Sequence, residues 1–246
     1  QLSAHYPKMT LAPAPDYAAH FLSLPHATAH LVFGNAFYYP LKTHKDVRDL
    51  DMLASALGQL AKLPKGEAVA VQIRVAPAGS SWQQTAARVI AAGVPDLSSQ
   101  TGRSKQHPHA RLIESKINQV GFFVAFRIMA VAENELRAKA LIGDLAGSYG
   151  VFTLGEGNSL HVSEPAFWQK AKLEGAFLSR SGDVTPKYQV FGASELASLW
   201  HPPGLALSMI KNISWGAMLT GEAPENLPVS PGASQGGPIA TEDEEA

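Results

Sequence analysis

The chain has 246 residues, a formal net charge of -1 and no cysteine. The near-neutral charge gives no global electrostatic attraction to nucleic acid, and the lack of cysteine excludes a disulfide framework, a thiolate metal site and a cysteine nucleophile. With 46% hydrophobic and 17% charged residues, the composition is that of a folded globular protein, long enough for one large domain or two small ones.

The N-terminal part is predicted to contain one short helix and one strand. Residues 1–30 are rich in Pro, Ala and His and are interpreted as an entry segment, with a short helix at Tyr17–Leu22. The run from His30 to Tyr39 is β-prone and aromatic, and Gly34 with Asn35 interrupts it. We therefore expect a bulged or bent strand there.

The next elements show the two hydrophobic periods clearly. Leucines recur at helical spacing in residues 46–62 and predict an amphipathic helix that covers a sheet. From Ala68 to Ala76, aliphatic residues alternate with Gln72 and Arg74, which predicts a strand with one apolar face. A helix is expected over Trp82–Ala92, with a capping box at its start.

A polar, turn-rich stretch at residues 93–106 divides the chain near its midpoint. After it, the apolar spacing predicts a helix over Ala110–Val120. The run Phe122–Val131 is apolar on both faces, which is typical of a central strand. A further helix is expected over Glu133–Tyr149.

The helix–strand–helix order thus occurs twice, and a short strand at residues 188–191 and a short helix at Ser194–Trp200 follow. We predict an α+β fold of two tandem ferredoxin-like (α/β-plait) halves with antiparallel sheets. The expected boundaries are residues 31–100 for the first half and 101–215 for the second. Residues 216–246 are rich in Pro, Gly and Ser and end in acidic residues, so they are predicted to be a linker or flexible tail.

The sequence lacks complete catalytic motifs. It contains no G-x-x-x-x-G-K-[ST] loop for a nucleotide phosphate. The glycines near Ser159 do not form a nucleophile elbow, because His161 stands where a glycine is required. His26 and His30 have the spacing of two metal ligands on a helix, but no carboxylate matches them, so packed or solvent-facing side chains are expected instead. We predict no enzymatic activity, no cofactor and no metal.

Basic residues are the candidate phosphate contacts. Arg127 and Arg74 lie opposite the aliphatic row in the two strongest strands, where Arg127 is the polar exception on its face, and Phe123 is a partial match to the aromatic surface with which α/β plaits bind RNA. A second group, for which a solvated loop is the simpler interpretation, runs from the midpoint loop into a helix. It comprises Arg103, Lys105, His107, His109 and Arg111. These residues support, as an alternative function, a freestanding nucleic-acid-binding plait.

The segment SELASLWHPP, residues 194–203, resembles the signature that precedes the motor in TraG-like, HerA/FtsK-type ATPases of conjugative DNA transfer and type IV secretion. Four further stretches resemble the same family in the same order, so that the similarity covers most of residues 38–229. They are YYPLKTHKDVRDLDMLASALGQLAKLPKGEAVAVQIRVAP, SSWQQTAARVI, HARLIESKINQVGFFVAFRIMAVAENELRAKALIGDLAGSYG and ISWGAMLTGEAPENLPV. In the family, the motor follows the PENLP stretch and membrane-spanning helices commonly precede the region; neither is present in this sequence.

The resemblance implies a non-catalytic accessory or interaction domain of a DNA-translocating ATPase, cytoplasmic and at the inner face of the cell membrane. The implied partners are the motor domain or subunits of the secretion complex, with DNA and further copies of the chain as additional candidates. No catalytic residue carries over, because the catalytic positions of the family lie in the motor. The residues expected at an interface or hinge, where prolines stop a short helix, are Glu195, Leu196, Leu199, Trp200, His201 and Pro202.

Overall fold

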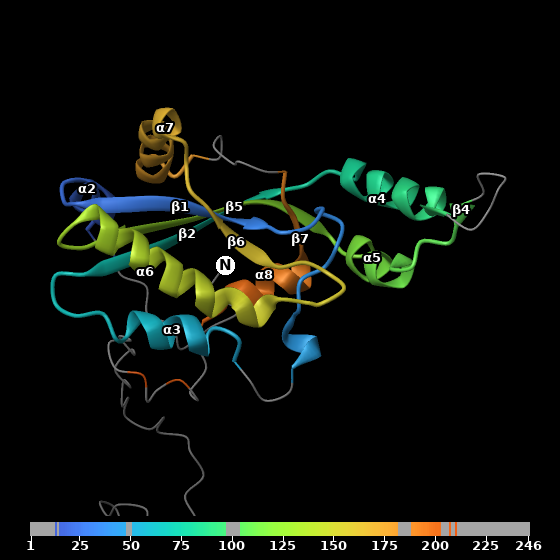
Figure 1. Cartoon of the computed structure of the whole chain (residues 1–246), viewed down its shortest axis with the longest axis horizontal. Coiled ribbons are helices and arrows are strands. Elements are labelled where there is room, and N and C mark those ends of the chain that lie inside the picture. Colours follow the sequence, from blue (N-terminus) through green and yellow to red (C-terminus); the bar gives the residue numbers. More distant parts are fainter. Residues whose placement is uncertain are drawn as a thin grey trace, which may run out of the picture. The chain divides into compact units, whose positions relative to one another are not determined.

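A five-stranded antiparallel sheet with helices on both faces forms the framework of the protein (Figure 1). The computed structural model describes residues 13, 15–47, 51–96, 104–181, 188–202, 207 and 210, which all lie in one compact unit, Ala12–Ser214. The strand order is β2-β5-β1-β6, and the short strand β7 pairs with the start of β5. The strands are β1 (His26–Phe33), β2 (Ala68–Pro77), β5 (Gly121–Val131), β6 (Leu160–Ser163) and β7 (Val190–Gly192).

The four longer strands and two helices form a single β-α-β-β-α-β unit. Helix α3 (Ala54–Leu60) lies between β1 and β2 in the chain, and α6 (Glu135–Ser148) lies between β5 and β6. Strands β1 and β2 are each antiparallel to β5 and therefore parallel to each other, and β5 fills the position between them. This arrangement is the ferredoxin-like, split β-α-β pattern.

The predicted α+β class with antiparallel pairing is confirmed, whereas the division into two tandem plait halves is not. Strand β1 crosses from the predicted entry segment into the predicted first half, β2 lies in that first half, and β5 and β6 lie in the second, yet all four belong to one sheet. The physical reason lies in the first crossover. The crossover through α3 leads into β2, which runs parallel to β1 with room for one strand between them. Strand β5, from the later part of the chain, occupies that position.

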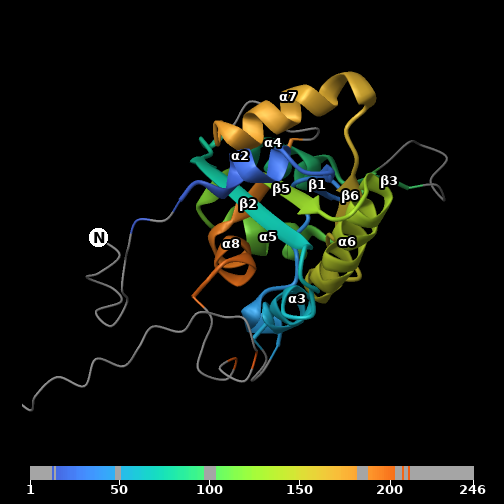
Figure 2. The same ribbon diagram turned by 90° about the vertical axis from the view of Figure 1, so that its left-hand side faces the viewer.

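One face of the sheet packs against α3 and α6 and holds the main hydrophobic core (Figure 2). Val71 and Ile73 of β2 lie on this face, as the alternating pattern predicts, and Phe126 of β5 packs beside them. Helix α6 contributes Leu141 and Leu145 from one stripe. Each such side chain stabilises the fold by about 1.5–3 kcal/mol when it is fully removed from water.

Two helices and a small hairpin are inserted between β2 and β5. Their bounds are α4 (Ser81–Ala92), β3 (Val94–Pro95), β4 (Ser104–Lys105) and α5 (Ala110–Ile117). Trp82 of α4 is buried against the start of β5, where a Cβ atom on Gly121 would lie 2.5 Å from the indole ring. Glycine at that position therefore allows the insertion to pack against the sheet.

Helices α2 (Tyr17–Leu22) and α7 (Phe167–Leu178) cover part of the opposite face (Figure 2). Arg127 of β5 is fully buried there. Its Nη1 donates hydrogen bonds to Gln72 Oε1 and to the Ala176 carbonyl, each at 2.9 Å, and its Nη2 donates to the Ser181 carbonyl at 2.6 Å. Since the last carbonyls of a helix have no intrahelical donor, this guanidinium caps the end of α7 from the sheet.

His30 of β1 pairs with Arg127 in the strand register and is also buried. Burial, and second the positive charge of Arg127, lower the pKa of His30 from 6.5 to about 4. Between these pH values the unfolded chain holds a proton that the folded chain does not. The free energy of unfolding is therefore expected to fall as the pH falls from 6.5 to 4, by about 2–3 kcal/mol.

Urea unfolding of the parent protein and of a His30→Gln variant at several pH values measures this contribution. The variant should lose less stability over the same interval, because glutamine does not titrate. His161→Gln is the matched control, since His161 is exposed on β6. Equal pH dependence in the parent and in His30→Gln would show that His30 binds its proton as readily in the folded state as in the unfolded one.

The predicted bounds of several elements agree with the structure, and others are wrong. Helix α2 is found as predicted, and β2, β5 and α6 differ from the prediction by one or two residues at an end. The predicted strand from His30 to Tyr39 instead begins at His26 and ends at Phe33, because the chain turns after it. The predicted helix over 46–62 is shorter in the structure, where α3 begins only at Ala54. A short 3-10 helix at His44–Asp46 ends where the predicted helix was to begin, and residues 48–50 lie outside the described part.

Two further differences concern caps and missed elements. The predicted capping box between Ser81 and Gln84 is wrong, since Ser80 is the N-cap of α4 and makes no side-chain cap hydrogen bond. Strand β6 and helix α7 have no counterpart in the prediction, nor does the 3-10 helix Tyr149–Phe152 that follows α6. In the part of the chain that the structure describes, no helix combines the length and apolar character needed to cross a bilayer.

Candidate functional site

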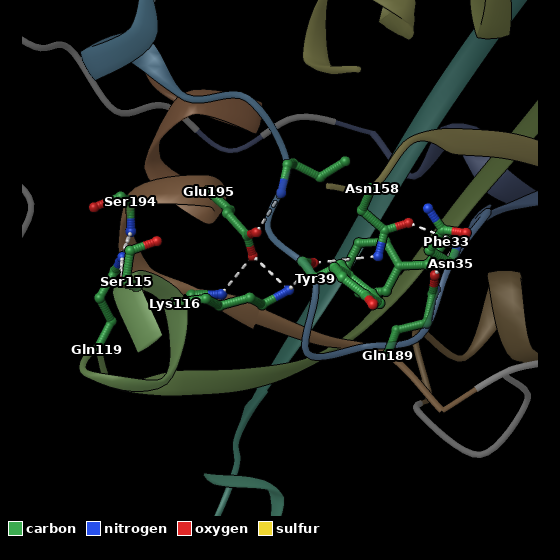
Figure 3. A network of polar contacts seen from close by, with 12 residues as sticks. Phe33, Asn35, Tyr39, Ser115, Lys116, Gln119, Asn158, Gln189, Ser194 and Glu195 are labelled. Atoms are coloured by element: carbon green, nitrogen blue, oxygen red, sulfur yellow. Dashed lines mark hydrogen bonds and ion pairs between the residues drawn. The ribbon is translucent and has the colours of Figure 1, made fainter. Parts of the chain in front are cut away.

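The SELASLWHPP segment forms α8 (Ala193–Leu199), and its glutamate is the centre of a buried polar network (Figure 3). Glu195 is only 2% exposed. Leu41 donates its backbone N–H to Glu195 Oε1, and Gly192 donates its N–H to Oε2, each at 2.7 Å. The carboxylate therefore joins the first turn of α8 to β7 and to the segment that follows β1.

Lys116 of α5 supplies the opposite charge (Figure 3). Its side chain is 0% exposed, and its Nζ lies 3.1 Å from Glu195 Oε2. The same ammonium donates to the Tyr39 carbonyl at 3.2 Å and lies 4.6 Å from the centroid of the Phe33 ring. Burial lowers the pKa of Lys116, and the charge and hydrogen bond of Glu195 oppose that shift. A carboxylate, a carbonyl and a ring face thus replace the water that the ammonium loses.

The second half of α8 is also fixed by side-chain hydrogen bonds. Ser198 Oγ accepts from the His44 N–H at 2.9 Å and donates to the Ser194 carbonyl at 2.8 Å. His201 lies with Nδ1 3.1 Å from the Ala197 carbonyl and Nε2 3.1 Å from Asp51 Oδ1. His201 therefore caps the end of the helix, as its position in the sequence suggests.

The predicted interface residues divide into a buried and an exposed set. Glu195 and Leu199 are buried, and Leu196 packs on the main core from a partly buried position. At the end of the helix Trp200 is 61% exposed and Pro202 is also exposed. The segment is thus a helix fixed to the core that presents one large aromatic side chain.

Two buried amides hold the neighbouring loops in place (Figure 3). Asn158 Oδ1 accepts from the Asn35 N–H at 2.9 Å, and Asn158 Nδ2 donates to the carbonyls of Ala36 and Tyr39 at 3.0 and 3.2 Å. Gln189 spans to β1, where its Oε1 accepts from the Phe33 N–H at 2.7 Å. These contacts fix the backbone on which a series of aromatic side chains stands.

These aromatic side chains lie in a continuous series, here called the aromatic row. In order they are Phe123, Tyr188, Phe37, Tyr38 and Tyr39. Successive ring centroids are 5.3, 5.0, 5.4 and 5.0 Å apart. The Tyr39 ring in turn lies 6.4 Å from His107 and 6.0 Å from His109. The row therefore connects the open part of the sheet with the loop before α5.

A groove of about 250 Å³ lies at the sheet end of the row. Arg74, Ala76 and Ala125 line it together with Phe123 and Tyr188, and Tyr188 is 49% exposed. Burial of the ring raises the pKa of Tyr188, so its hydroxyl stays neutral at physiological pH. Arg74 is the one charged side chain among the described residues that line this groove. The groove thus combines apolar surface, ring faces and a single cation.

The predicted phosphate contacts do not form one site. Arg127 is buried under α7 and its guanidinium is engaged by the helix end, so it does not face solvent. Lys105 of β4 forms an ion pair with Asp96 at 2.9 Å. Arg111 is exposed on α5, and Arg103 lies outside the described residues.

The histidines and the serine discussed above also have defined places. His26 Nε2 lies 3.0 Å from Glu174 Oε1, and both His26 and His30 are on a strand, not a helix. Ser159 Oγ and His161 Nε2 are 2.7 Å apart, but no carboxylate is recorded on the other nitrogen of His161 among the described residues. Within the described ranges, no group of three His, Cys, Asp or Glu side chains could hold a metal ion.

Comparison with protein family models, with curated proteins and with solved structures finds no match for this chain. The sequence patterns single out Glu195 but not Lys116, Asn158, Gln189 or Tyr188. For Lys116, the sequence does contain one signal. It lies three residues after Ile113 and six after Ala110, on the buried face of α5, where a lysine needs an anionic partner.

Proposed function

We propose that this chain is a non-catalytic interaction domain of an ATPase that translocates DNA during conjugation, as part of a type IV secretion system. In this proposal it acts in the cytoplasm at the inner face of the membrane, and Trp200 is the anchor on which the motor domain or a neighbouring subunit docks. The observation that carries the proposal is the contrast within α8. Glu195 and Leu199 are buried, and Glu195 is bonded to Leu41, Gly192 and Lys116, whereas Trp200 at the helix end is 61% exposed.

The chemistry of interfaces supports this choice of anchor. A few large side chains, with tryptophan among the most frequent, dominate the binding energy of protein interfaces. An anchor on a rigid helix loses little conformational entropy on binding, because its backbone is already fixed. The resemblance of this segment to the signature before the motor supports a motor domain as the partner class.

The first test is a calorimetric titration of the full chain with ATP and Mg²⁺. We expect no saturable heat and no hydrolysis, and saturable nucleotide binding would contradict a non-catalytic role. The second test requires the motor. The DNA that follows this reading frame is expected to encode it, with a phosphate-binding loop in frame.

Trp200→Ala is expected to weaken the binding of this chain to that motor domain roughly tenfold or more, measured by calorimetry. The matched control is Trp168→Ala, because Trp168 is also exposed, at 70%, but lies on α7. If both variants bind as the parent does, or if only Trp168→Ala weakens binding, α8 is not the docking surface.

A further inference from the structure

We propose that the aromatic row and Arg74 form a binding site for single-stranded nucleic acid, with bases stacked on the rings and a phosphate at the guanidinium. The inference goes beyond the docking role of α8 and does not depend on it. The arginine of the sheet that contacts the phosphate is Arg74 and not Arg127, because Arg127 is buried and Arg74 is exposed.

The continuity of the rings is the first argument, since each ring from Phe123 to Tyr38 meets the next one edge to face. Successive centroids lie 5.0–5.4 Å apart from Phe123 to Tyr39, across three separate segments of the chain. Single-stranded nucleic acid is bound by aromatic side chains on which successive bases stack, and such stacking tolerates any base. Tyr188 is exposed, whereas Phe123 and Phe37 are half-buried, so each ring is supported by the fold.

The support beneath the row is the second argument. Asn158 forms hydrogen bonds with the backbone of Asn35, Ala36 and Tyr39. Gln189, which follows Tyr188 in the chain, forms a hydrogen bond with Phe33 of β1. Both amides are buried, and each uses its oxygen as an acceptor and its nitrogen as a donor; Gln189 Nε2, for example, donates to the Leu31 carbonyl. Rings that stand on a fixed backbone form a preorganised surface, which lowers the entropic cost of binding.

Charge is the third argument. Arg74 stands in the groove beside Phe123 and Tyr188, and none of the described lining residues is acidic. At the other end of the row, Tyr39 lies near His107 and His109, and the exposed Arg111 lies in the first turn of α5. Glu156 Oε2 lies 3.6 Å from His109 Nδ1 at this end. The cation in the groove is therefore the one that the row offers to a phosphate, and a basic groove beside stacking rings matches a polyanion with unpaired bases.

Single-stranded nucleic acid fits better than a duplex. The groove holds about 250 Å³, and the rings of Phe123 and Tyr188 are among its described lining residues. Such rings can stack on splayed bases, whereas a groove of this size does not follow a double helix. The net charge of -1 also provides little of the backbone attraction on which duplex binding depends.

Fluorescence anisotropy with a labelled oligothymidylate of about 15 nucleotides, at about 50 mM salt, tests the inference with the full chain. Saturable binding is expected, and Tyr188→Ala should weaken it roughly tenfold through the loss of one stacking surface. Arg74→Gln should reduce the slope of log K against log salt by about 0.7, as the loss of one phosphate contact requires. Arg74 is exposed, so this variant keeps the fold.

Two matched controls complete the experiment. Trp168→Ala removes an exposed aromatic ring from α7, and Lys62→Ala removes an exposed cation beside α3 on the opposite face of the sheet; both should bind as the parent does. The inference is wrong if the parent does not bind, if it prefers a duplex of equal length, or if Tyr188→Ala and Arg74→Gln bind unchanged. It is equally wrong if a proline-rich peptide binds at the row and the oligonucleotide does not.

Discussion

Glu195→Ala is expected to lower the free energy of unfolding by about 3–5 kcal/mol. The substitution leaves the Lys116 ammonium in a site that is 0% exposed, with no carboxylate 3.1 Å away. It also leaves the backbone N–H groups of Leu41 and Gly192 without the oxygens that accept them. A buried cation that loses its counter-charge costs far more than the pair contributes, because its desolvation is no longer offset. Urea denaturation followed by circular dichroism measures the change.

The pH dependence of the same variant gives an independent check. With the opposing influence of Glu195 removed, burial alone acts on Lys116 and lowers its pKa further. In the unfolded chain this lysine keeps its ordinary pKa of about 10.4. Over the interval between the two values, the unfolded state binds the additional proton. The stability of the variant should therefore rise as the pH is raised toward 10.

Two controls separate this effect from ordinary loss of side-chain volume. Lys139 and Glu164 form an exposed pair at 3.2 Å, so Glu164→Ala should cost less than about 1 kcal/mol. The double variant Lys116→Met with Glu195→Leu removes both charges and should recover the part of the loss that is due to the unpaired ammonium. The N–H groups of Leu41 and Gly192 stay without their acceptor in this variant. If Glu195→Ala costs no more than Glu164→Ala, the buried pair is not what holds α8 to the core.

Local patterns in the sequence predicted the elements of the core face because periodicity is a local property. The alternation in β2, the continuous apolar run of β5 and the stripe of α6 each mark one buried surface, and these elements are found nearly where they were expected. Strand order is not local. β5 pairs with β2 on one edge and with β1 on the other, and no pattern within any single segment specifies both partners.

Helix α7 shows why the opposite face was missed. Its buried residues are Leu173, Ala176 and Phe177, but Phe167 and Trp168 at its start are 86% and 70% exposed. Apolar residues on both sides of the helix conceal the 3.6-residue period. Because the sequence does not predict α7, it gives no sign that this helix covers Arg127, and it therefore favours a solvent-facing arginine there.

The candidate site was predictable only in part for the same reason. The SELASLWHPP segment stands out in the sequence, and the short helix expected there is found at Ala193–Leu199. The aromatic row, in contrast, combines residues of the loop after β1, Phe123 at the start of β5, and Tyr188 just before β7. Only the tertiary structure brings these segments together.

Arg127→Met is expected to destabilise the protein by about 3 kcal/mol or more and to loosen α7 in particular. Methionine fills much of the volume but donates no hydrogen bond, so the Ser181 carbonyl and the Gln72 amide oxygen lose the donor that Arg127 supplies. The Ala176 carbonyl keeps only the Ser181 N–H, at 3.2 Å. Each buried acceptor without a donor costs about 1–3 kcal/mol. Urea unfolding measures the total, and amide hydrogen exchange shows whether the last turn of α7 loses protection before β5 does.

Arg74→Met is the matched control, because Arg74 lies on the same face of the same sheet but is exposed. Its substitution should change the free energy of unfolding by no more than about 0.5 kcal/mol.

A second consequence of Arg127→Met distinguishes loss of charge from loss of packing. The positive charge of Arg127 helps to hold the pKa of His30 down, so Arg127→Met should raise that pKa, which an NMR titration of His30 measures. The acid-induced loss of stability assigned to His30 should then become smaller in the variant. An unchanged pKa together with unchanged exchange in α7 would mean that the buried guanidinium holds neither the helix nor the histidine.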